Sequence, residues 1–476
     1  MNSKLQYEVR TLGRTATLGR FLPLHAVGLL FLLCSGTAAA QEPPQLELQP
    51  CRAGSIEARC GVLEVFENRA AKSGRKIPLR VVVLPATESA QRVADPVFLL
   101  VGGPGQGAAE AAQGAGPQFL ERIRRARDVV LVDQRGTGAS NPLRCNLYGD
   151  PDDMSGYFTQ VLPLESLVAC REELARNAEL ALYTTPLALE DLDDVRAALN
   201  YTRVNLFGGS YGTQVALAYL RKYPQRVRSM VISSVAPMDY RLPLPIARGF
   251  QQALERVFAD CEADASCHAA FPRLREEFAA VLVQLEAAPV KQDAPNPVTR
   301  RIQQVEITRE AVLHHLRLLL YSTENIRAVP LMIHMMAQGD FGFFAFAAFQ
   351  HARNVELQIA RGQHLTVVCS EHVPFISERD IRRQTAGTWM GDSLVRRYQQ
   401  ACRQWPRGQV SATFLDDVKS HTPALLLSGE LDPVTPPSLG ARVARNLPRS
   451  KQIVLIGMSH TIASECADRL AAEFIE

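Results

Sequence analysis

One serine flanked by glycines constrains the fold of this chain more than any other feature. The stretch GGSYG at residues 208–212 follows a short apolar run at residues 204–207 and precedes a segment with the apolar spacing of a helix. A serine on a sharp turn between a strand and a helix needs small residues on both sides, because side chains there would collide with neighbouring backbone. The pattern therefore predicts a strand, a strained turn that exposes the hydroxyl of Ser210, and a helix.

Other short apolar runs end in turn residues and indicate further strands. A helical pattern at residues 187–199 precedes the serine strand, so strands and helices alternate along this part of the chain. Such alternation predicts a doubly wound, mostly parallel sheet. The expected strands are residues 60–66, 77–84, 96–101, 128–132, 204–207, 227–233, 424–427 and 452–456.

The periodicity changes near Leu242, and from there to about Ser411 amphipathic helical patterns dominate. A helical block between two strands of one sheet predicts a cap over the carboxyl ends of the strands, where ligands bind in open α/β sheets. The expected organisation is a signal peptide at residues 1–40, the first part of the sheet domain at 41–240, a mainly helical cap at 241–415 and the second part of the sheet domain at 416–476.

The first forty residues have the pattern of a secretory signal. A basic segment ends at Arg20, an apolar stretch covers residues 21–33, and Ala38-Ala39-Ala40 forms a cleavage site. A membrane anchor is the alternative, but the apolar stretch is shorter than the ~20 residues that a spanning helix needs. We therefore expect export to the periplasm or the medium, with no stable membrane insertion after the signal is removed.

The formal charge of +3 arises entirely from this first segment, which carries Lys4, Arg10, Arg14 and Arg20 against Glu8. The remainder of the chain is neutral, so it has no basic excess for an acidic polymer. This balance argues against nucleic acid as a partner.

Nine cysteines follow the signal segment, and an exported chain meets an oxidising compartment where disulfides form. Pairing nearest neighbours gives Cys51–Cys60, Cys145–Cys170, Cys261–Cys267 and Cys369–Cys402, with Cys466 left over, although sequence alone leaves the connectivity open. No C-x-x-C or H-E-x-x-H pattern occurs, so no metal site is expected.

A serine hydroxyl becomes a useful nucleophile only when a base removes its proton and an acid orients that base. Asp432 and His460 each follow a predicted strand near the end of the chain, in the order serine, acid, histidine. Both therefore belong at the same sheet edge as Ser210. Glu430 is the alternative acid, but the Asp432-Pro433 pair sits in the turn where the acid loop belongs.

A glycine cluster, GGPGQG at residues 102–107, follows an early strand. Glycines let backbone N–H groups approach a developing negative charge, so Gly102 and Gly103 are candidates for an oxyanion hole, together with the N–H of Tyr211. A nucleotide loop is the alternative, but the G-K-[ST] ending is missing. No cofactor is therefore expected.

Five motifs together resemble one family, the proline iminopeptidase and tripeptidyl-aminopeptidase group of α/β-hydrolases. The resemblance extends from about Cys60 to the C-terminus, and the secretion signal and cysteines look like the exported tripeptidyl branch. Typical proline iminopeptidases carry tryptophan and histidine where this chain has Tyr211 and Val101, which argues against a strict proline preference. The motifs are GGPG (102–105), DQRGTGAS (133–140), GGSYGT (208–213), SGELDPVTPP (428–437) and the segment 457–460.

The resemblance implies an α/β-hydrolase fold and a serine aminopeptidase that acts on peptides with a free N-terminus through an acyl-enzyme on Ser210. It also implies a cap carboxylate that binds the substrate ammonium group, for which Glu371 beside Cys369 is the candidate. Asp133 and Arg135 are expected to be structural. A carboxylesterase on the same scaffold and a non-catalytic binding protein are the alternatives, the latter disfavoured by the intact Ser-Asp-His set.

Overall fold

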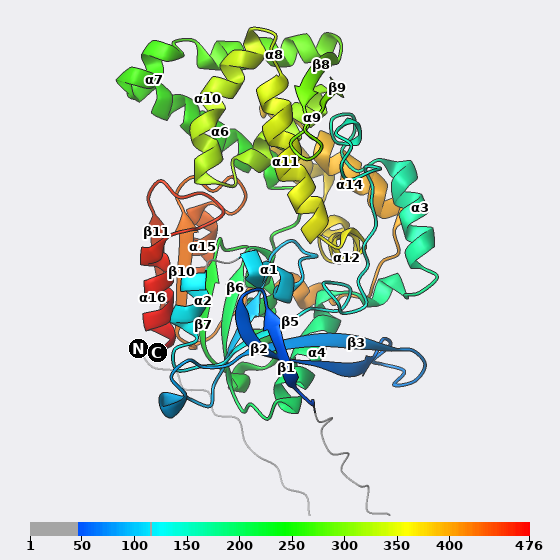
Figure 1. Cartoon of the computed structure of the whole chain (residues 1–476), viewed down its shortest axis with the longest axis vertical. Helices are drawn as coiled ribbons and strands as arrows, with labels where there is room; N and C mark the ends of the chain where they lie inside the picture. The colour runs from blue at the N-terminus through cyan, green and yellow to red at the C-terminus, as the bar shows by residue number, and fades with distance from the viewer. Residues whose placement is uncertain (1–45, 115–116) are drawn as a thin grey trace, which may run out of the picture. The chain divides into compact units, whose positions relative to one another are not determined.

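Nine strands form one mixed sheet in the computed structural model, which describes residues 46–114 and 117–476 (Figure 1). The predicted signal peptide lies outside the described residues. Six strands in the order β5-β4-β6-β7-β10-β11 run parallel, and β1, β2 and β3 extend the sheet on the β5 side with antiparallel pairing. The strands are β1 Gln49–Ala53, β2 Ile56–Phe66, β3 Lys76–Leu84, β4 Val97–Leu100, β5 Val129–Val132, β6 Val204–Gly209, β7 Val227–Ser233, β10 Ala424–Gly429 and β11 Ser450–Leu455.

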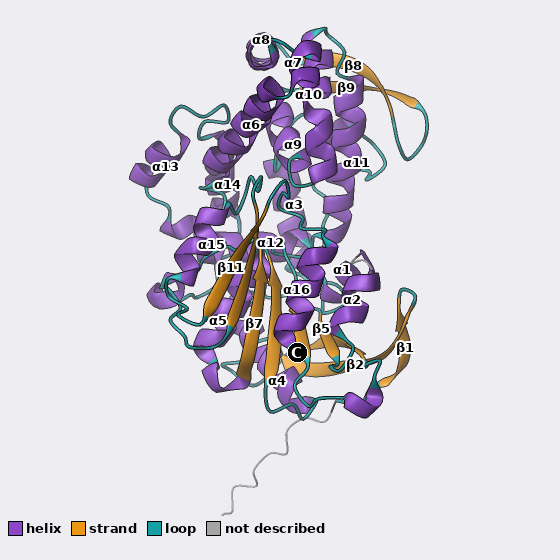
Figure 2. Cartoon of the chain, turned by 90° about the vertical axis from the view of Figure 1, so that its left-hand side faces the viewer, coloured by secondary structure: helices purple, strands orange, loops and turns teal. Residues whose placement is uncertain are grey.

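Helices cover both faces of this sheet, and Figure 2 shows the sheet nearly edge-on between them. Because the central strands are buried on both faces, β4 and β5 consist of apolar residues only, VFLL and VVLV. This arrangement confirms the predicted doubly wound sheet. Helices α1 Ala108–Gly114, α2 Pro117–Ile123 and α16 Glu465–Ile475 pack on one face, and α4 Thr185–Ala198, α5 Tyr211–Lys222 and α15 Pro437–Ala444 pack on the other.

Between β7 and β10 the chain leaves the sheet and forms a largely helical region beyond the strand ends, at the top of Figure 1. The helices there are α6 Ile246–Ala263, α7 Ala265–Ala270, α8 Leu274–Ala287, α9 Arg309–Leu319, α10 Thr323–Ala337, α11 Gly342–Gln358, α12 Arg361–Val367, α13 Glu378–Thr385 and α14 Ser393–Gln404. Helix α3, Leu164–Leu174, comes from an earlier connection and packs beside α12 and α14.

A hairpin of β8 Val290–Pro295 and β9 Ile302–Ile307 interrupts these helices and was not predicted. Exposed residues alternate with less exposed ones along both strands, and only Ala294, Val305 and Ile307 are buried. Strands of this kind lack the apolar runs on which the sequence prediction of strands depended.

All four predicted disulfides are present, Cys51–Cys60, Cys145–Cys170, Cys261–Cys267 and Cys369–Cys402. Cys466 is exposed and has no disulfide partner among the described residues. In the same part of the chain, none of the helices combines the length and the apolar character that a bilayer span requires.

Candidate active site

Ser210 occupies the turn between β6 and α5 with a φ of 53° and a ψ of −121°, which is strained for a residue with a side chain. The flanking glycines make this turn possible. A Cβ atom on Gly208 would lie 2.6 Å from the carbonyl oxygen of Gly212, and one on Gly212 would lie 2.1 Å from the carbonyl oxygen of Leu100. Gly208 is therefore required by the close approach of the backbone within the turn, and Gly212 by the close approach of β4.

The three predicted catalytic side chains lie within hydrogen-bond distance of one another. Nε2 of His460 is 3.0 Å from Oγ of Ser210, and Nδ1 of His460 is 2.9 Å from Oδ2 of Asp432. In this geometry the imidazole can accept the serine proton while the carboxylate holds its tautomer and orientation. Asp432 and His460 follow the neighbouring parallel strands β10 and β11, whose carboxyl ends meet at one edge of the sheet.

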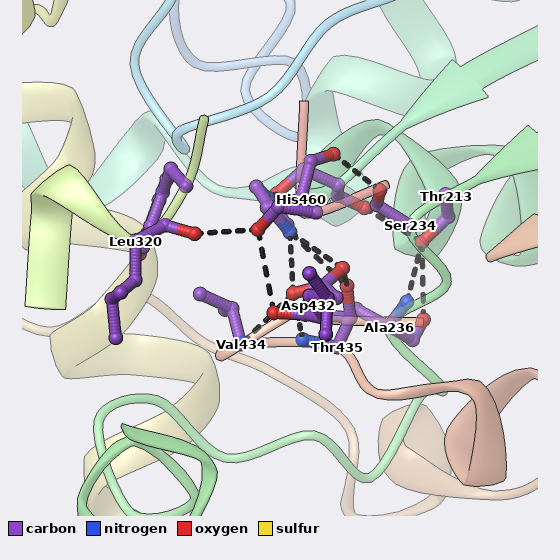
Figure 3. Close-up of polar contacts among 12 residues, drawn as sticks. Thr213, Ser234, Ala236, Leu320, Asp432, Val434, Thr435 and His460 are labelled. Atoms are coloured by element: carbon purple, nitrogen blue, oxygen red, sulfur yellow. Dashed lines mark hydrogen bonds and ion pairs between the residues drawn. The ribbon is translucent and has the colours of Figure 1, made fainter. Parts of the chain in front are cut away.

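Asp432 is held as a carboxylate by its surroundings (Figure 3). Burial would raise the pKa of Asp432, but the charge of His460 and hydrogen bonds from His460 and Thr435 outweigh it and lower this pKa below its usual value. The N–H of Val434 donates to Oδ1 at 2.8 Å, and the hydroxyl of Thr435 donates to Oδ2 at 2.7 Å. The ionised form can therefore stabilise a protonated imidazole during the reaction.

Glu430, the alternative acid, contacts Gly457 and Arg256 and not His460. Its Oε2 accepts a hydrogen bond from the N–H of Gly457 at 3.0 Å, and its Oε1 lies 3.4 Å from a guanidinium nitrogen of Arg256. The loop after β10 thus brings Asp432, and not Glu430, against His460.

The loop that carries His460 is held from two sides. The hydroxyl of Ser234, after β7, donates to the carbonyl oxygen of His460 at 2.6 Å. From the helical region, the carbonyl oxygen of Leu320 accepts a hydrogen bond from the Ser459 hydroxyl, and the Tyr321 ring lies 4.8 Å from the His460 ring between centroids. The helical region thus takes part in positioning the imidazole.

The predicted oxyanion-hole residues line the same cavity as Ser210. A Cβ atom on Gly102 would lie 3.3 Å from Cβ of Ser210, so this backbone passes directly beside the serine. Within the described residues, the N–H groups of Gly102 and Gly103 donate no hydrogen bond, and Tyr211 begins α5, where a backbone N–H has no partner inside the helix. Free donors are therefore available close to the nucleophile.

Asp133 and Arg135 are fully buried and hold loops in place. The Asp133 carboxylate accepts the N–H groups of Ala109 and Ala139, which joins the start of α1 to the loop after β5. Arg135 pairs with Asp191 of α4 through two hydrogen bonds of 2.6 and 2.8 Å, and not with Asp133.

Glu371, predicted to bind a substrate ammonium group, does not line the cavity. It lies in a π-helical turn, Val368–His372, is 1% exposed, and accepts the N–H of Thr185 at 2.6 Å at the start of α4. Burial raises the pKa of Glu371 to about 7. The hydroxyl of Thr185 lies 2.5 Å from that of Tyr211, so Glu371 supports the wall of the site from behind and has no direct access to a ligand.

A cavity of about 1000 Å³ lies between the sheet edge and the helical region and contains Ser210 and His460. Several polar residues that line the cavity from its helical side were not predicted, because they belong to segments whose proximity depends on tertiary packing. The stretch HHLR in α9 was a local sign of two of them, His314 and Arg317. These residues include His314, Arg317, Tyr321, His351, Glu356 and Arg361. Within the described residues, no group of three or more His, Cys, Asp or Glu side chains is arranged to hold a metal ion.

Comparison with known proteins matches two parts of the chain to families. Residues 95–270 match the family described as alpha/beta hydrolase fold, and residues 388–476 match the family described as TAP-like protein. The two matches contain Ser210 and the pair Asp432 and His460, respectively. The chain is an α/β-hydrolase.

Several relatives of this α/β-hydrolase carry peptidase names. Serine protease Hip1 of Mycobacterium tuberculosis is 25% identical over 513 aligned residues, covering 95% of this chain and 94% of its own. The tripeptidyl aminopeptidase of Streptomyces lividans is 31% identical over 199 residues, 37% of this chain and 35% of its own. A proline iminopeptidase of Xylella fastidiosa is 28% identical over 145 residues, which cover 29% of this chain and 32% of its own. These names confirm the predicted resemblance to the proline iminopeptidase and tripeptidyl-aminopeptidase group, and the α/β-hydrolase is a serine hydrolase.

Proposed function

We propose that this α/β-hydrolase is an exported serine peptidase that removes residues or short peptides from free peptide N-termini. The observation that carries the proposal is the hydrogen-bonded set of Ser210, His460 and Asp432, of which Ser210 and His460 line the cavity between the sheet edge and the helical region. The peptidase names of relatives that align with 95% and 37% of this chain support the choice of peptide bonds.

The proposed reaction is acyl transfer in two steps. His460 Nε2 takes the proton of the Ser210 hydroxyl as Oγ bonds to the scissile carbonyl carbon, and the N–H groups of Gly102, Gly103 and Tyr211 stabilise the oxyanion. The C–N bond then breaks, and the imidazolium returns its proton to the leaving amine. In the second step, water gives a proton to His460 as it attacks the acyl carbon. The bond from that carbon to Oγ of Ser210 then breaks, His460 returns the proton to Oγ, and the acid is released.

An aminopeptidase must hold the ammonium group of its substrate, and we assign this role to Glu356 in place of Glu371. Glu356, in α11, is the carboxylate that the helical region contributes to the cavity lining, and its side chain is 16% exposed. Its ion pair with Arg361 fixes the orientation of the carboxylate, which keeps further acceptor capacity for an ammonium group.

Export is proposed from the cysteines. Four disulfides are typical of proteins that fold outside the reducing cytosol, and they agree with the signal peptide expected at residues 1–40.

The proposed function is tested with tripeptidyl and aminoacyl anilides, each with a free and an acetylated N-terminus, beside short acyl esters. We expect the free anilides to be cleaved and acetylation to abolish cleavage, and Ser210→Ala to abolish turnover. Preferential hydrolysis of the esters, with no effect of the N-terminus, would make the protein a carboxylesterase. Absence of all turnover in the folded protein would favour a binding function.

A further inference from the structure

One wall of the cavity carries a buried positive charge that the proposed reaction does not use. Arg317 lies in α9, lines the cavity and is 5% exposed. Its Nη1 donates to the hydroxyl of Tyr321 at 2.6 Å, and its Cζ lies 5.4 Å from the centroid of that ring. Its Nε has no hydrogen-bond partner, and no carboxylate within the described residues forms an ion pair with it.

Unlike Arg317, each of the other buried arginines in the described chain forms an ion pair with a carboxylate. A guanidinium group cannot release its proton, and a buried charge without an opposite charge is costly. The pairs are Arg127 with Asp95, Arg135 with Asp191, Arg196 with Asp193 and Arg361 with Glu356. Arg317 is therefore the buried arginine whose counter-charge has to come from outside the described chain.

The neighbours of Arg317 provide neutral hydrogen-bonding groups. His314, also in α9, and His351 of α11 line the cavity, and Nδ1 of His314 and Nε2 of His351 have no partner. Burial, together with the charge of Arg317, lowers the pKa of both histidines, so both are neutral and add no competing positive charge at neutral pH. A neutral imidazole can still donate one N–H to an acceptor.

We propose that Arg317, His314 and His351 form an anion subsite that binds a carboxylate group of the substrate. The inference rests on the proposed peptidase function and narrows its substrate class to peptides that carry a carboxylate within reach of the cavity. A planar carboxylate suits the fork of a guanidinium group and accepts hydrogen bonds from it and from the imidazoles. Two carboxylates of a peptide qualify, an acidic side chain and the α-carboxylate of a short peptide.

Two sets of free-N-terminal substrates distinguish these sources. In one set, tripeptidyl anilides carry glutamate or glutamine at the first, second or third position. In the other set, short unblocked peptides end in an α-carboxylate or a carboxamide. We expect kcat/KM to favour the carboxylate about tenfold to a hundredfold in one of the two sets, the range for a hydrogen bond to a charged group.

Substitution of the arginine tests its role in that preference. Arg317→Gln is expected to bring the ratio of kcat/KM values close to one, and Arg317→Lys to retain part of it. Arg327→Gln is the matched control, because it removes the same charge from an exposed position of α10 and should keep the wild-type ratio. Should Arg317→Gln fail to fold, calorimetric binding of glutamate- and glutamine-containing tripeptide amides to Ser210→Ala measures the same preference.

A wild-type ratio near one in both sets, or an unchanged ratio in Arg317→Gln, overturns the subsite. If neutral anilides with a free N-terminus are cleaved and acetylation blocks them, that result leaves the peptidase function standing. If acetylation has no effect, or no anilide is cleaved, the proposed function fails, and the subsite as a peptide-carboxylate site fails with it.

Discussion

The hydroxyl of Ser459 donates a hydrogen bond to the carbonyl oxygen of Leu320, and this contact joins the loop of His460 to the helical region. Ser459 is fully buried. A second contact runs parallel to it, because the N–H of Thr461 donates to the carbonyl oxygen of Tyr321 at 2.9 Å. The residues on both sides of the imidazole are therefore attached to the segment that follows α9, so the position of His460 depends on the docking of the helical region.

Replacing Ser459 with alanine should lower both stability and activity. The buried carbonyl oxygen of Leu320 loses its donor, which should cost about 1–3 kcal/mol of unfolding free energy. A small displacement of His460 should lower kcat/KM about ten- to a hundredfold. Urea unfolding and anilide kinetics measure the two effects. Ser377→Ala, which removes an exposed cap of α13, serves as the control and should lower stability only. Unchanged kinetics in Ser459→Ala would contradict the positioning role.

Replacing Glu356 with glutamine tests the proposed ammonium ligand. Loss of the charged acceptor should reduce kcat/KM for free-N-terminal anilides about tenfold to a hundredfold and leave N-acetylated substrates at their low basal rate. The ratio of the two rates within one preparation is the readout, because it does not depend on the folded fraction. Glu262→Gln removes an exposed carboxylate of α6 and should leave the ratio unchanged. An unaltered ratio in Glu356→Gln would rule out this assignment.

Replacing Glu371 with glutamine should increase stability in a pH-dependent manner. The folded-state pKa of Glu371, about 7, lies above the value of 4.5 for an unperturbed glutamate because the carboxyl is buried. Below the lower pKa, the Glu371 carboxyl is protonated in both the folded and the unfolded protein, so the pKa difference does not change the unfolding free energy. As pH rises towards the higher value, the unfolded chain loses its proton while the folded chain keeps it, and the wild type becomes progressively less stable.

The unfolding free energy of Glu371→Gln relative to wild type should therefore rise by about 2–3 kcal/mol between about pH 4.5 and pH 7 and then level off. Urea unfolding at several pH values measures this difference. A constant difference across the range would mean that the folded and unfolded proteins bind the Glu371 proton equally well.

The disulfides should differ in their contribution to stability. Cys369–Cys402 closes a separation of 33 residues, and Cys261–Cys267 closes one of 6. Because a longer loop restricts the unfolded chain more strongly, replacing both cysteines by alanine should cost about 4 kcal/mol for the first pair and about 2 kcal/mol for the second. Denaturant unfolding of the two double variants tests the order, and a larger loss for Cys261–Cys267 would contradict it.

Sequence patterns predicted those strands of the sheet whose own residues favour a buried strand. Residues 204–207 and 227–233 are rich in valine, leucine, isoleucine, phenylalanine and methionine, and the structure has β6 and β7 there. The hairpin of β8 and β9 escaped prediction because polar residues separate its apolar ones, so neither strand contains an apolar run. Nearest-neighbour pairing succeeded for the disulfides because each pair lies within one local region of the fold.

Glu371 illustrates the limit of the same reasoning at the site. Its position beside Cys369 and in the helical region suggested a rigid carboxylate, which it is. Its direction, however, depends on how the π-helical turn packs against the start of α4, and that packing points the carboxylate at Thr185. The sequence holds no signal for this direction, because the two segments are 186 residues apart.

The sequence by itself determined the nucleophilic turn, the chain order of serine, acid and histidine, and the alternation of strands and helices. These features are local, because a sharp turn demands glycines and a buried strand demands apolar residues. Only the tertiary structure decided which charged side chains of the helical region enter the cavity. That choice follows from the packing of α9, α11 and α12 over the sheet edge, and the rotation of a helix about its axis is set by contacts between distant segments.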